Sequence, residues 1–124
     1  MGKLFFHCGV YTDKFTKQIE VLGSLTATVL EMSNIGRALR APAEGDRHVF
    51  SNSDNLFNGM RVAIHRDLLN INDVVVFFNH EVDGYLQTTI VPFTQDGRAN
   101  QWPLGFFDQI DNDLFDILDW KQTV

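Results

Sequence analysis

The segment DVVVFFNHEVDGYLQTTIVPF, residues 73–93, decides the fold more than any other part of the sequence. Residues 73–81 are rich in β-branched and aromatic side chains, which predicts a strand. Asp83 and Gly84 are typical of a tight turn, and residues 85–93 should return as the partner strand. Pro92 cannot donate a backbone hydrogen bond, so this second strand should end there or lie at an edge. The segment therefore predicts a β-hairpin.

Upstream of the hairpin, predicted strands alternate with predicted helices. Short apolar runs predict strands at residues 3–10 and 48–51. Apolar residues at three- and four-residue spacing predict helices over residues 15–32 and 54–69. Residues 34–47 contain two glycines, a proline and the densest group of basic side chains, Arg37, Arg40 and Arg47, and we expect them to form a loop.

A third amphipathic helix is predicted over residues 104–121, near the end of the chain. The order strand, helix, strand, helix, hairpin, helix predicts an α/β fold. We expect a small mixed sheet of four to five strands, including a C-terminal hairpin, packed by three helices. The chain has 124 residues and no linker, which predicts a single domain over residues 1–124.

Composition excludes several classes of protein. The net charge is −6 and the basic residues are scattered, which argues against nucleic-acid binding. No apolar run approaches the roughly 20 residues that a membrane-spanning helix needs. Cys8 is the only cysteine, so an intrachain disulfide is impossible. We therefore expect a cytoplasmic protein that binds neither membranes nor nucleic acid.

Residues 97–118, GRANQWPLGFFDQIDNDLFDIL, carry a family resemblance. They resemble the C-terminal signature of bacterial ATPases of the ABC/SMC-like AAA class, related to the overcoming-lysogenization-defect ATPases of phage-defence systems. That signature has a Gly-Arg turn, a Trp-Pro pair, a Gly-Phe-Phe-Asp and an amphipathic helix, and all four stand here in order. Residues 51–78 are similar to the segment that begins with the family's Thr-His-Ser-Asp switch motif. The first forty-odd residues match only weakly.

The departures from this family concern its catalytic residues. The chain has no G-x-x-x-x-G-K-[ST] loop. The resemblance places His7 where the Walker B glutamate would stand and Asn52 where the switch histidine would stand. Phosphoryl transfer needs a phosphate cradle, a metal ligand and a positioned water, so we expect no ATP hydrolysis and no cofactor. The resemblance therefore implies a truncated, degenerate relative of these ATPases.

The histidines offer an alternative function. His7, His48 and His80, together with phenylalanines, could line the pocket of a small ligand-binding domain or enzyme. No His-x-x-x-His spacing occurs and there is only one thiol, so we expect no metal site. Cys8 would need an activating base, which His48 could supply if their strands adjoin, but a buried structural cysteine is favoured.

Trp102, Phe106 and Phe107 are either core residues beneath the last helix or exposed anchors of an interface. We expect a non-catalytic interaction protein that associates with itself as a homo-oligomer or binds a partner ATPase. The strands at residues 4–6 and 74–78 motivate this expectation. In a larger ATPase they would have neighbours on both sides, and without those neighbours they would become sheet edges that pair with another chain.

Overall fold

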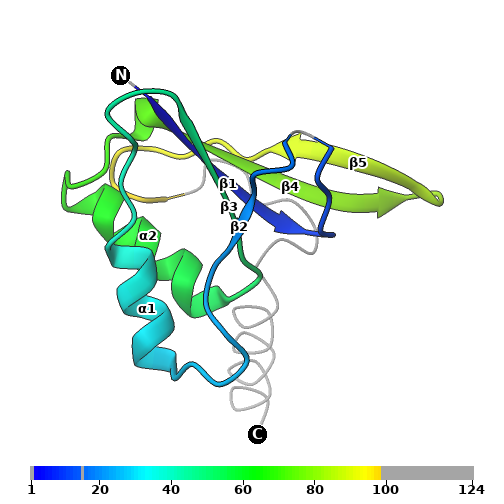
Figure 1. The fold of residues 1–124 in the computed structure, drawn as a ribbon. Coiled ribbons are helices and arrows are strands. Elements are labelled where there is room, and N and C mark those ends of the chain that lie inside the picture. Colours follow the sequence, from blue (N-terminus) through cyan, green and yellow to red (C-terminus); the bar gives the residue numbers. More distant parts are fainter. Residues whose placement is uncertain (1, 15, 99–124) are drawn as a thin grey trace, which may run out of the picture.

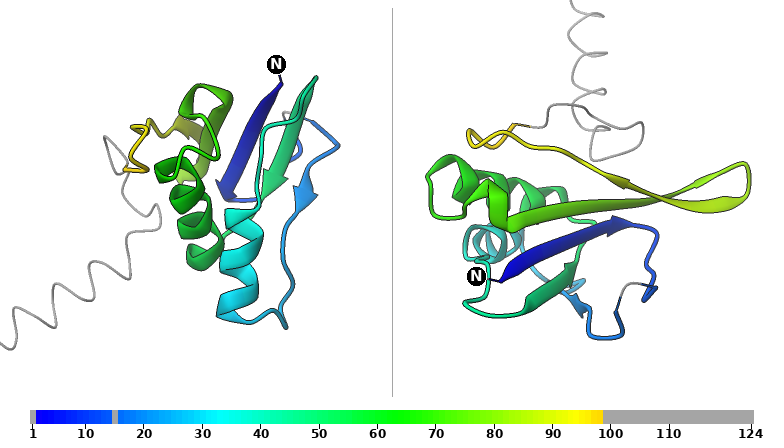
Figure 2. Two further views of the ribbon diagram at one scale, coloured as in Figure 1. Left: turned by 90° about the vertical axis from the view of Figure 1, so that its left-hand side faces the viewer. Right: turned by 90° about the horizontal axis from the view of Figure 1, so that it is seen from above.

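The computed structural model describes residues 2–14 and 16–98, which form one mixed sheet with two α-helices on one side of it (Figures 1 and 2). The strand order is β2-β3-β1-β4-β5. The elements, in chain order, are β1 (Lys3–Gly9), β2 (Glu20–Val21), α1 (Val29–Arg37), β3 (Asp46–Phe50), α2 (Asp54–His65), the short 3-10 helix η1 (Ile71–Asp73), β4 (Val74–Val82) and β5 (Tyr85–Ile90). The predicted α/β class and the five-stranded mixed sheet are confirmed.

The central strand of the sheet is β1, which runs parallel to both of its neighbours. Phe5 lies beside His48 of β3 and beside Val75 of β4. The outer strand β2 is parallel to β3, whereas β5 is antiparallel to β4. The β4–β5 hairpin turns at Asp83 and Gly84, both with positive φ, as a two-residue turn of this kind requires. The predicted hairpin is confirmed.

The core lies between the sheet and the two helices. Alternate residues of β1 face the helices, because side chains of a strand point to opposite sides in turn. Phe6 contacts Phe57 of α2 with ring centroids 5.5 Å apart. Burying one such side chain contributes roughly 1.5–3 kcal/mol. The fully buried apolar side chains include Leu4, Phe6, Val49, Leu56, Phe57, Met60, Ile64 and Val76.

The helices α1 and α2 contact each other through two glycines. A Cβ atom on Gly36 would lie 1.9 Å from the Leu56 carbonyl oxygen, and one on Gly59 would lie 2.2 Å from the Ser33 carbonyl oxygen. Any larger residue would therefore force the two backbones apart. At the start of α2 the Ser53 hydroxyl acts as the N-cap, since it accepts a hydrogen bond from the Leu56 N–H.

The predicted helix over residues 15–32 is wrong. That region contains the short strand β2 and the loop after it, where Gly23 has a φ of +80°. The helix starts only at Val29, behind the Thr28 cap, and continues to Arg37 through the first part of the predicted loop. The periodic apolar pattern was misleading because Leu25 and Val29 are exposed, although Leu22 packs against the core.

Two further expectations need correction. Three helices were predicted, but the described part of the chain holds two α-helices and the 3-10 helix; the third predicted helix, residues 104–121, lies outside the described residues. The strands at residues 4–6 and 74–78 are not sheet edges, because β1 lies between β3 and β4, and β4 lies between β1 and β5. The outer strands are β2 and β5.

Candidate functional site

The carboxyl ends of β1 and β3 form a candidate ligand site, because ligands of α/β sheets bind outside the carboxyl ends of parallel strands. These ends carry His7 and Cys8 on β1, and Asn52 two residues after the end of β3. His48 lies earlier on β3 and approaches the same strand. These four residues include both positions that the family resemblance singles out.

Asn52 ties the two strands together. Its side-chain carbonyl accepts a hydrogen bond from the Gly9 N–H at 2.6 Å, and its side-chain amide donates to the Gly9 carbonyl at 2.8 Å. Next to this pair, the Ser51 N–H donates to the His7 carbonyl at 3.1 Å. The Asn52 side chain thus continues the hydrogen bonding of the sheet past the end of β3. We call this two-bond contact the Asn52 latch.

Gly9 is required where the latch holds it. Its φ is +86°, and a Cβ atom there would lie 2.0 Å from the Asn79 carbonyl oxygen. The next residue, Val10, donates its N–H to that same carbonyl at 2.8 Å. The end of β1 is therefore held on one side by Asn52 and on the other by β4.

His7 and His48 form a direct contact on the sheet face that points away from the helices. The distance from His7 Nε2 to His48 Nδ1 is 2.9 Å, so one nitrogen donates a proton and the other accepts it. Burial, followed by the proximity of His48, lowers the pKa of His7 to about 4. Burial also lowers the pKa of His48, against the opposing effect of Asp46. At neutral pH the pair is therefore uncharged.

The histidine pair is embedded in stacked rings. Phe5 stacks on His48, with ring centroids 4.6 Å apart, and on Phe77, with centroids 5.7 Å apart. The His7 ring lies 5.1 Å from the Phe77 ring. This packing restricts the reorientation of either imidazole and accounts for the desolvation that disfavours their charged forms.

His80, the third histidine of the candidate pocket, lies elsewhere. It points to the opposite face of the sheet, where it stacks on Phe78 with centroids 4.9 Å apart. Its Nε2 lies 2.9 Å from the Thr89 hydroxyl. The structure therefore brings His7 and His48 together and places His80 away from both.

Cys8 has the environment of a structural cysteine. It is 1 % exposed on the face that packs against the helices, and its thiol lies 3.5 Å from the Phe77 carbonyl oxygen. Burial raises the pKa of this thiol far above its usual range, so it stays protonated. His48 cannot act as its base, because His48 projects from the other face of the sheet.

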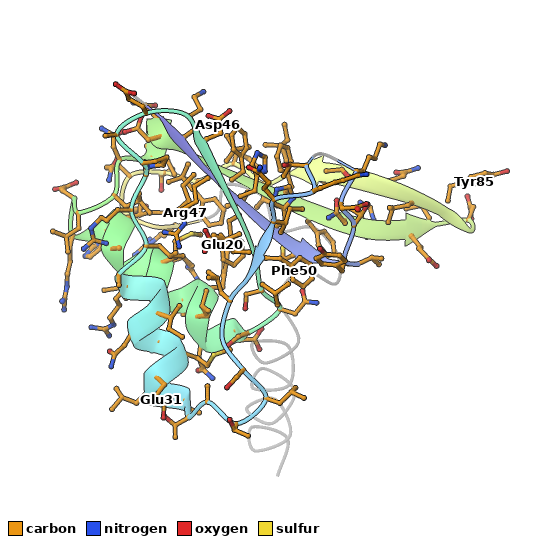
Figure 3. All side chains as sticks on the ribbon, in the orientation of Figure 1. Glu20, Glu31, Asp46, Arg47, Phe50 and Tyr85 are labelled. Carbon is orange, nitrogen blue, oxygen red and sulfur yellow. The ribbon has the colours of Figure 1, made fainter. Side chains whose placement is uncertain are left out.

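A surface hollow of about 660 Å³ lies beside β2 and β3. Across it Arg47 and Glu20 form an ion pair, with 3.1 Å between the guanidinium nitrogen and the carboxylate oxygen (Figure 3). His48 contributes to its lining, whereas His7 does not. The lining residues are Thr16, Gln18, Glu20, Pro42, Asp46, Arg47 and His48.

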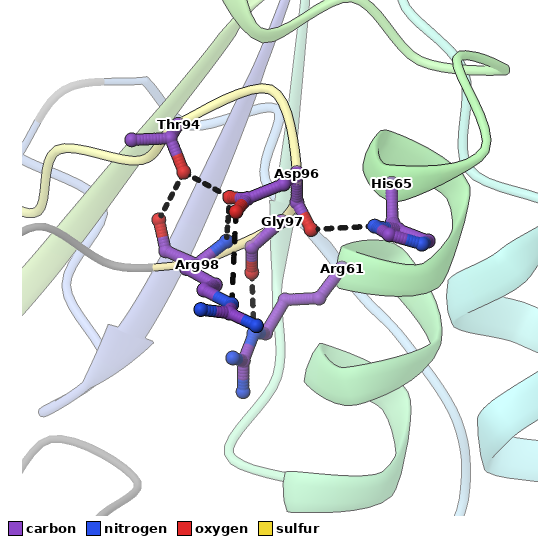
Figure 4. A network of polar contacts seen from close by, with 6 residues as sticks. All are labelled: Arg61, His65, Thr94, Asp96, Gly97 and Arg98. Atoms are coloured by element: carbon purple, nitrogen blue, oxygen red, sulfur yellow. Dashed lines mark hydrogen bonds and ion pairs between the residues drawn. The ribbon is translucent and has the colours of Figure 1, made fainter.

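Sequence reasoning missed a loop, residues 93–98, that is fastened to the end of α2. The Gln95 side chain accepts from the Ile71 N–H at 3.0 Å and donates to the Ile64 carbonyl at 2.8 Å. Arg61 of α2 donates to the Gly97 carbonyl at 2.8 Å (Figure 4). This loop contains the Gly-Arg turn of the family signature, so the signature begins docked on α2.

Polar contacts within the loop fix its shape (Figure 4). The Thr94 hydroxyl donates to the Asp96 carboxylate, and this bond, more than any other contact, lowers the pKa of that carboxyl. The Asp96 backbone carbonyl lies 2.9 Å from His65 Nδ1. The chain turns at Asp96 and Gly97, where Gly97 has a φ of +86°. No local sequence signal identifies Gln95 as the residue that holds this loop.

Exposed apolar side chains gather on the β4–β5 hairpin. Tyr85 at the turn is 76 % exposed (Figure 3), and Leu86 and Ile90 are 40 % and 61 % exposed. The residues predicted for an interface, Trp102, Phe106 and Phe107, lie outside the described residues.

Comparison with known proteins gives one family match. Residues 69–117 match the model of a family described as a protein of unknown function (DUF3696), and that family is associated with AAA-like ATPase proteins. The match covers less than half of the chain and includes η1, β4, β5 and the docked loop. No curated protein and no solved structure matches the chain.

Residues 2–14 and 16–98 lack two features. No helix there is both long and apolar enough to cross a bilayer. The same residues contain no group of three or more His, Cys, Asp or Glu side chains arranged to hold a metal ion.

Proposed function

We propose that this chain is a non-catalytic interaction protein, a remnant of an ATPase head that associates with itself or with a partner ATPase. Two observations support the relation to ATPases. The family matched by residues 69–117 is associated with AAA-like ATPase proteins. The three parallel strands β1, β3 and β4 also follow one another along the chain in the order that the resemblance implies for the Walker B strand, the switch strand and the strand after it.

The observation that carries the non-catalytic part of the proposal is the Asn52 latch. The resemblance places Asn52 at the position of the family's switch histidine. Here both polar atoms of that side chain are used by the Gly9 backbone. The residue at the Walker B glutamate position, His7, is buried and uncharged at neutral pH because its pKa is about 4. Neither residue is therefore placed to orient water or hold magnesium.

The choice of partner follows from the proposed relation to ATPases. The resemblance to ATPase heads makes a second copy of the chain or an intact ATPase the natural partner. We assign Trp102, Phe106 and Phe107 as further anchors, since large aromatic residues dominate interface energetics. By resemblance, we place the chain among phage-defence proteins and assign it to the cytoplasm.

Calorimetric titration with ATP and Mg²⁺ tests the loss of nucleotide chemistry. We expect no heat of binding up to millimolar nucleotide. The variant Asn52→Ala should be titrated in parallel, because it removes the side chain that binds the Gly9 backbone without adding a catalytic group. A dissociation constant below about 100 μM, which corresponds to about −5.5 kcal/mol, would contradict the proposal.

A second candidate, a ligand-binding domain, is favoured by the close approach of His7 and His48 beside the hollow. Its ligand would be a small polar molecule that contacts Arg47, Asp46 and His48. NMR titration of the imidazole resonances with a library of such molecules separates the two functions. Saturable shifts at His48 that are lost in Arg47→Ala would favour ligand binding, whereas shifts that do not saturate would favour the interaction protein.

A further inference from the structure

The outer edge of β5 differs from the other edge of the sheet. The β2 edge has only two residues, and the Glu20–Arg47 ion pair places charge beside it. The β5 edge has six residues, YLQTTI, without a charge or a proline. Among residues 2–14 and 16–98, no strand pairs with its outer side. An edge of this kind lacks the features by which proteins prevent pairing with another chain.

The backbone groups that face outward on this edge can be assigned. The Val91 N–H donates to the Val76 carbonyl at 3.0 Å, so the backbone of Val91 points toward β4. Backbone groups alternate in direction along a strand. Gln87 and Thr89 therefore also point toward β4, and the N–H and carbonyl groups of Leu86, Thr88 and Ile90 point outward.

The side chains of these three residues lie on the sheet face away from the helices. Thr88 shows this directly, because its hydroxyl donates to the Asn79 side chain at 2.7 Å, and Asn79 lies opposite it on β4. Leu86 and Ile90, two residues to either side of Thr88, have the same orientation. An exposed apolar side chain thus flanks each side of the central Thr88.

We propose that a second copy of this chain pairs antiparallel with β5 along its outer edge. In this pairing Thr88 lies opposite the partner subunit's Thr88, and Leu86 lies opposite the partner subunit's Ile90. The proposal rests on the proposed function, since it names the partner and the contact surface of the interaction protein. It yields one continuous sheet through both copies.

The register follows from symmetry. A two-fold axis perpendicular to the sheet keeps the helix-covered faces of both copies on one side, so only residues of the same parity lie opposite each other. Pairing centred on Thr88 brings all three outward-facing residues opposite outward-facing residues, and each such pair exchanges two hydrogen bonds. Pairing centred on Gln87 leaves Ile90 without an opposite residue in β5. The first register therefore uses every outward backbone group of the strand.

Side chains support the same register. The exposed Leu86 and Ile90 lie opposite each other across the interface on both sides of the axis, so two apolar pairs flank the central threonines. Directly opposed apolar side chains stabilise a pair of antiparallel strands. Because β5 carries no charge, pairing places no like charges of the strand opposite each other. The β5 edge of one copy is therefore complementary to the β5 edge of a second copy.

Single-cysteine variants at three neighbouring positions test the register. In the proposed dimer the two Thr88 Cα atoms lie about 5.5 Å apart, within the range that a disulfide spans. We expect Thr88→Cys to cross-link on mild oxidation, and Gln87→Cys and Thr89→Cys not to, because their Cα atoms lie more than about 7 Å from their own copies. The wild-type chain is the control for Cys8, which is buried.

A second pair of variants avoids the loss of the Thr88–Asn79 hydrogen bond. Leu86→Cys and Ile90→Cys change exposed side chains, so folding should be unaffected. An oxidised mixture of the two should cross-link, whereas each alone should not. Cross-links in either variant alone, or none in the mixture, would overturn the register.

Sedimentation tests the interface itself. The wild type should be a dimer at high micromolar concentration, and Ile90→Lys should weaken the dimer by about tenfold or more. Leu86→Lys combined with Ile90→Glu should restore it, since opposite charges then face each other. Val21→Lys on the β2 edge is the matched control and should have no effect.

The outcomes of these experiments separate this inference from the proposed function. A wild-type chain that is monomeric at these concentrations, or a dimer weakened by Val21→Lys but not by Ile90→Lys, would overturn the β5 interface. A dimer with the expected variants that also hydrolyses ATP would overturn the non-catalytic function and leave the interface standing.

Discussion

The carboxyl ends of β1 and β3 and the outer edge of β5 belong to the same sheet but use their backbones in opposite ways. At the carboxyl ends, the Asn52 side chain takes up both backbone groups of Gly9. On the β5 edge, the outward groups of Leu86, Thr88 and Ile90 have no strand partner in the described part of the chain. The backbone groups of Gly9 are thus hydrogen-bonded within the chain, whereas the outward backbone groups of β5 can pair with another strand.

This difference distinguishes the carboxyl ends of the strands, where α/β proteins bind ligands, from the sheet edge, where they can pair with another protein chain. Ligands of open α/β sheets bind in the crevice outside the carboxyl ends of the parallel strands. Here those ends hold an uncharged histidine pair and a protonated, buried thiol. An unpaired edge, by contrast, binds another strand without any special side chain. The distribution of free backbone groups therefore points to association.

Two glycine substitutions should give the largest contrast. Gly9 and Gly84 both have positive φ, but a Cβ atom would meet the Asn79 carbonyl at Gly9 and open space at Gly84. Gly9→Ala should therefore lower the free energy of unfolding by roughly 4 kcal/mol or more, and Gly84→Ala by about 1–2 kcal/mol. Urea denaturation measures both. Equal losses would mean that the end of β1 is not tightly held.

Acidification should have the next largest effect, a decrease in the free energy of unfolding. The pKa of His7 is about 4 in the folded chain and 6.5 unfolded, so the unfolded state binds the proton more readily. His7 therefore leaves the free energy of unfolding unchanged above about pH 6.5. As the pH falls toward 4, it lowers that free energy by up to roughly 3 kcal/mol.

The variant His7→Gln should flatten this pH dependence. His48→Gln should flatten it only in part, because burial, the larger cause of the shift, remains. Thermal or urea unfolding between pH 4 and 8 measures the slope. A slope that is unchanged in His7→Gln would assign the pH dependence to other groups.

Removal of the latch itself should have a somewhat smaller effect. Asn52→Ala loses both hydrogen bonds to Gly9 and should lower the free energy of unfolding by about 2 kcal/mol. Gln87→Ala, an exposed change on the β5 edge, should stay within about 0.5 kcal/mol. Asn52→His introduces the residue type that the resemblance implies at this position and should also destabilise the chain without conferring ATP hydrolysis. Stability equal to wild type in Asn52→Ala would contradict the structural role of the latch.

Local signals made parts of the fold predictable from the sequence. The Asp83–Gly84 turn and the β-branched run before it identify the hairpin, and Ser53 identifies the start of α2. In each case the residues that determine the structure are adjacent in the chain. The helix predicted over residues 15–32 failed because a long-range pairing with β3 selects a strand at Glu20–Val21.

The candidate site depends on long-range contacts that no local pattern encodes. Asn52 and Gly9 are 43 residues apart in the sequence, and His7 and His48 are 41 apart. The resemblance drew attention to His7 and Asn52, but only the structure shows that one is buried in stacked rings and the other holds a backbone. Gln95, which fastens the last described loop to α2, has no sequence signature.

Phosphate release from ATP by the purified chain is the most direct test of a non-catalytic protein. With Mg²⁺ present, we expect every column fraction to show only background release, and the protein peak to carry none. Release that follows the protein through each fraction, and that Asn52→Ala or His7→Gln alters, would contradict the account.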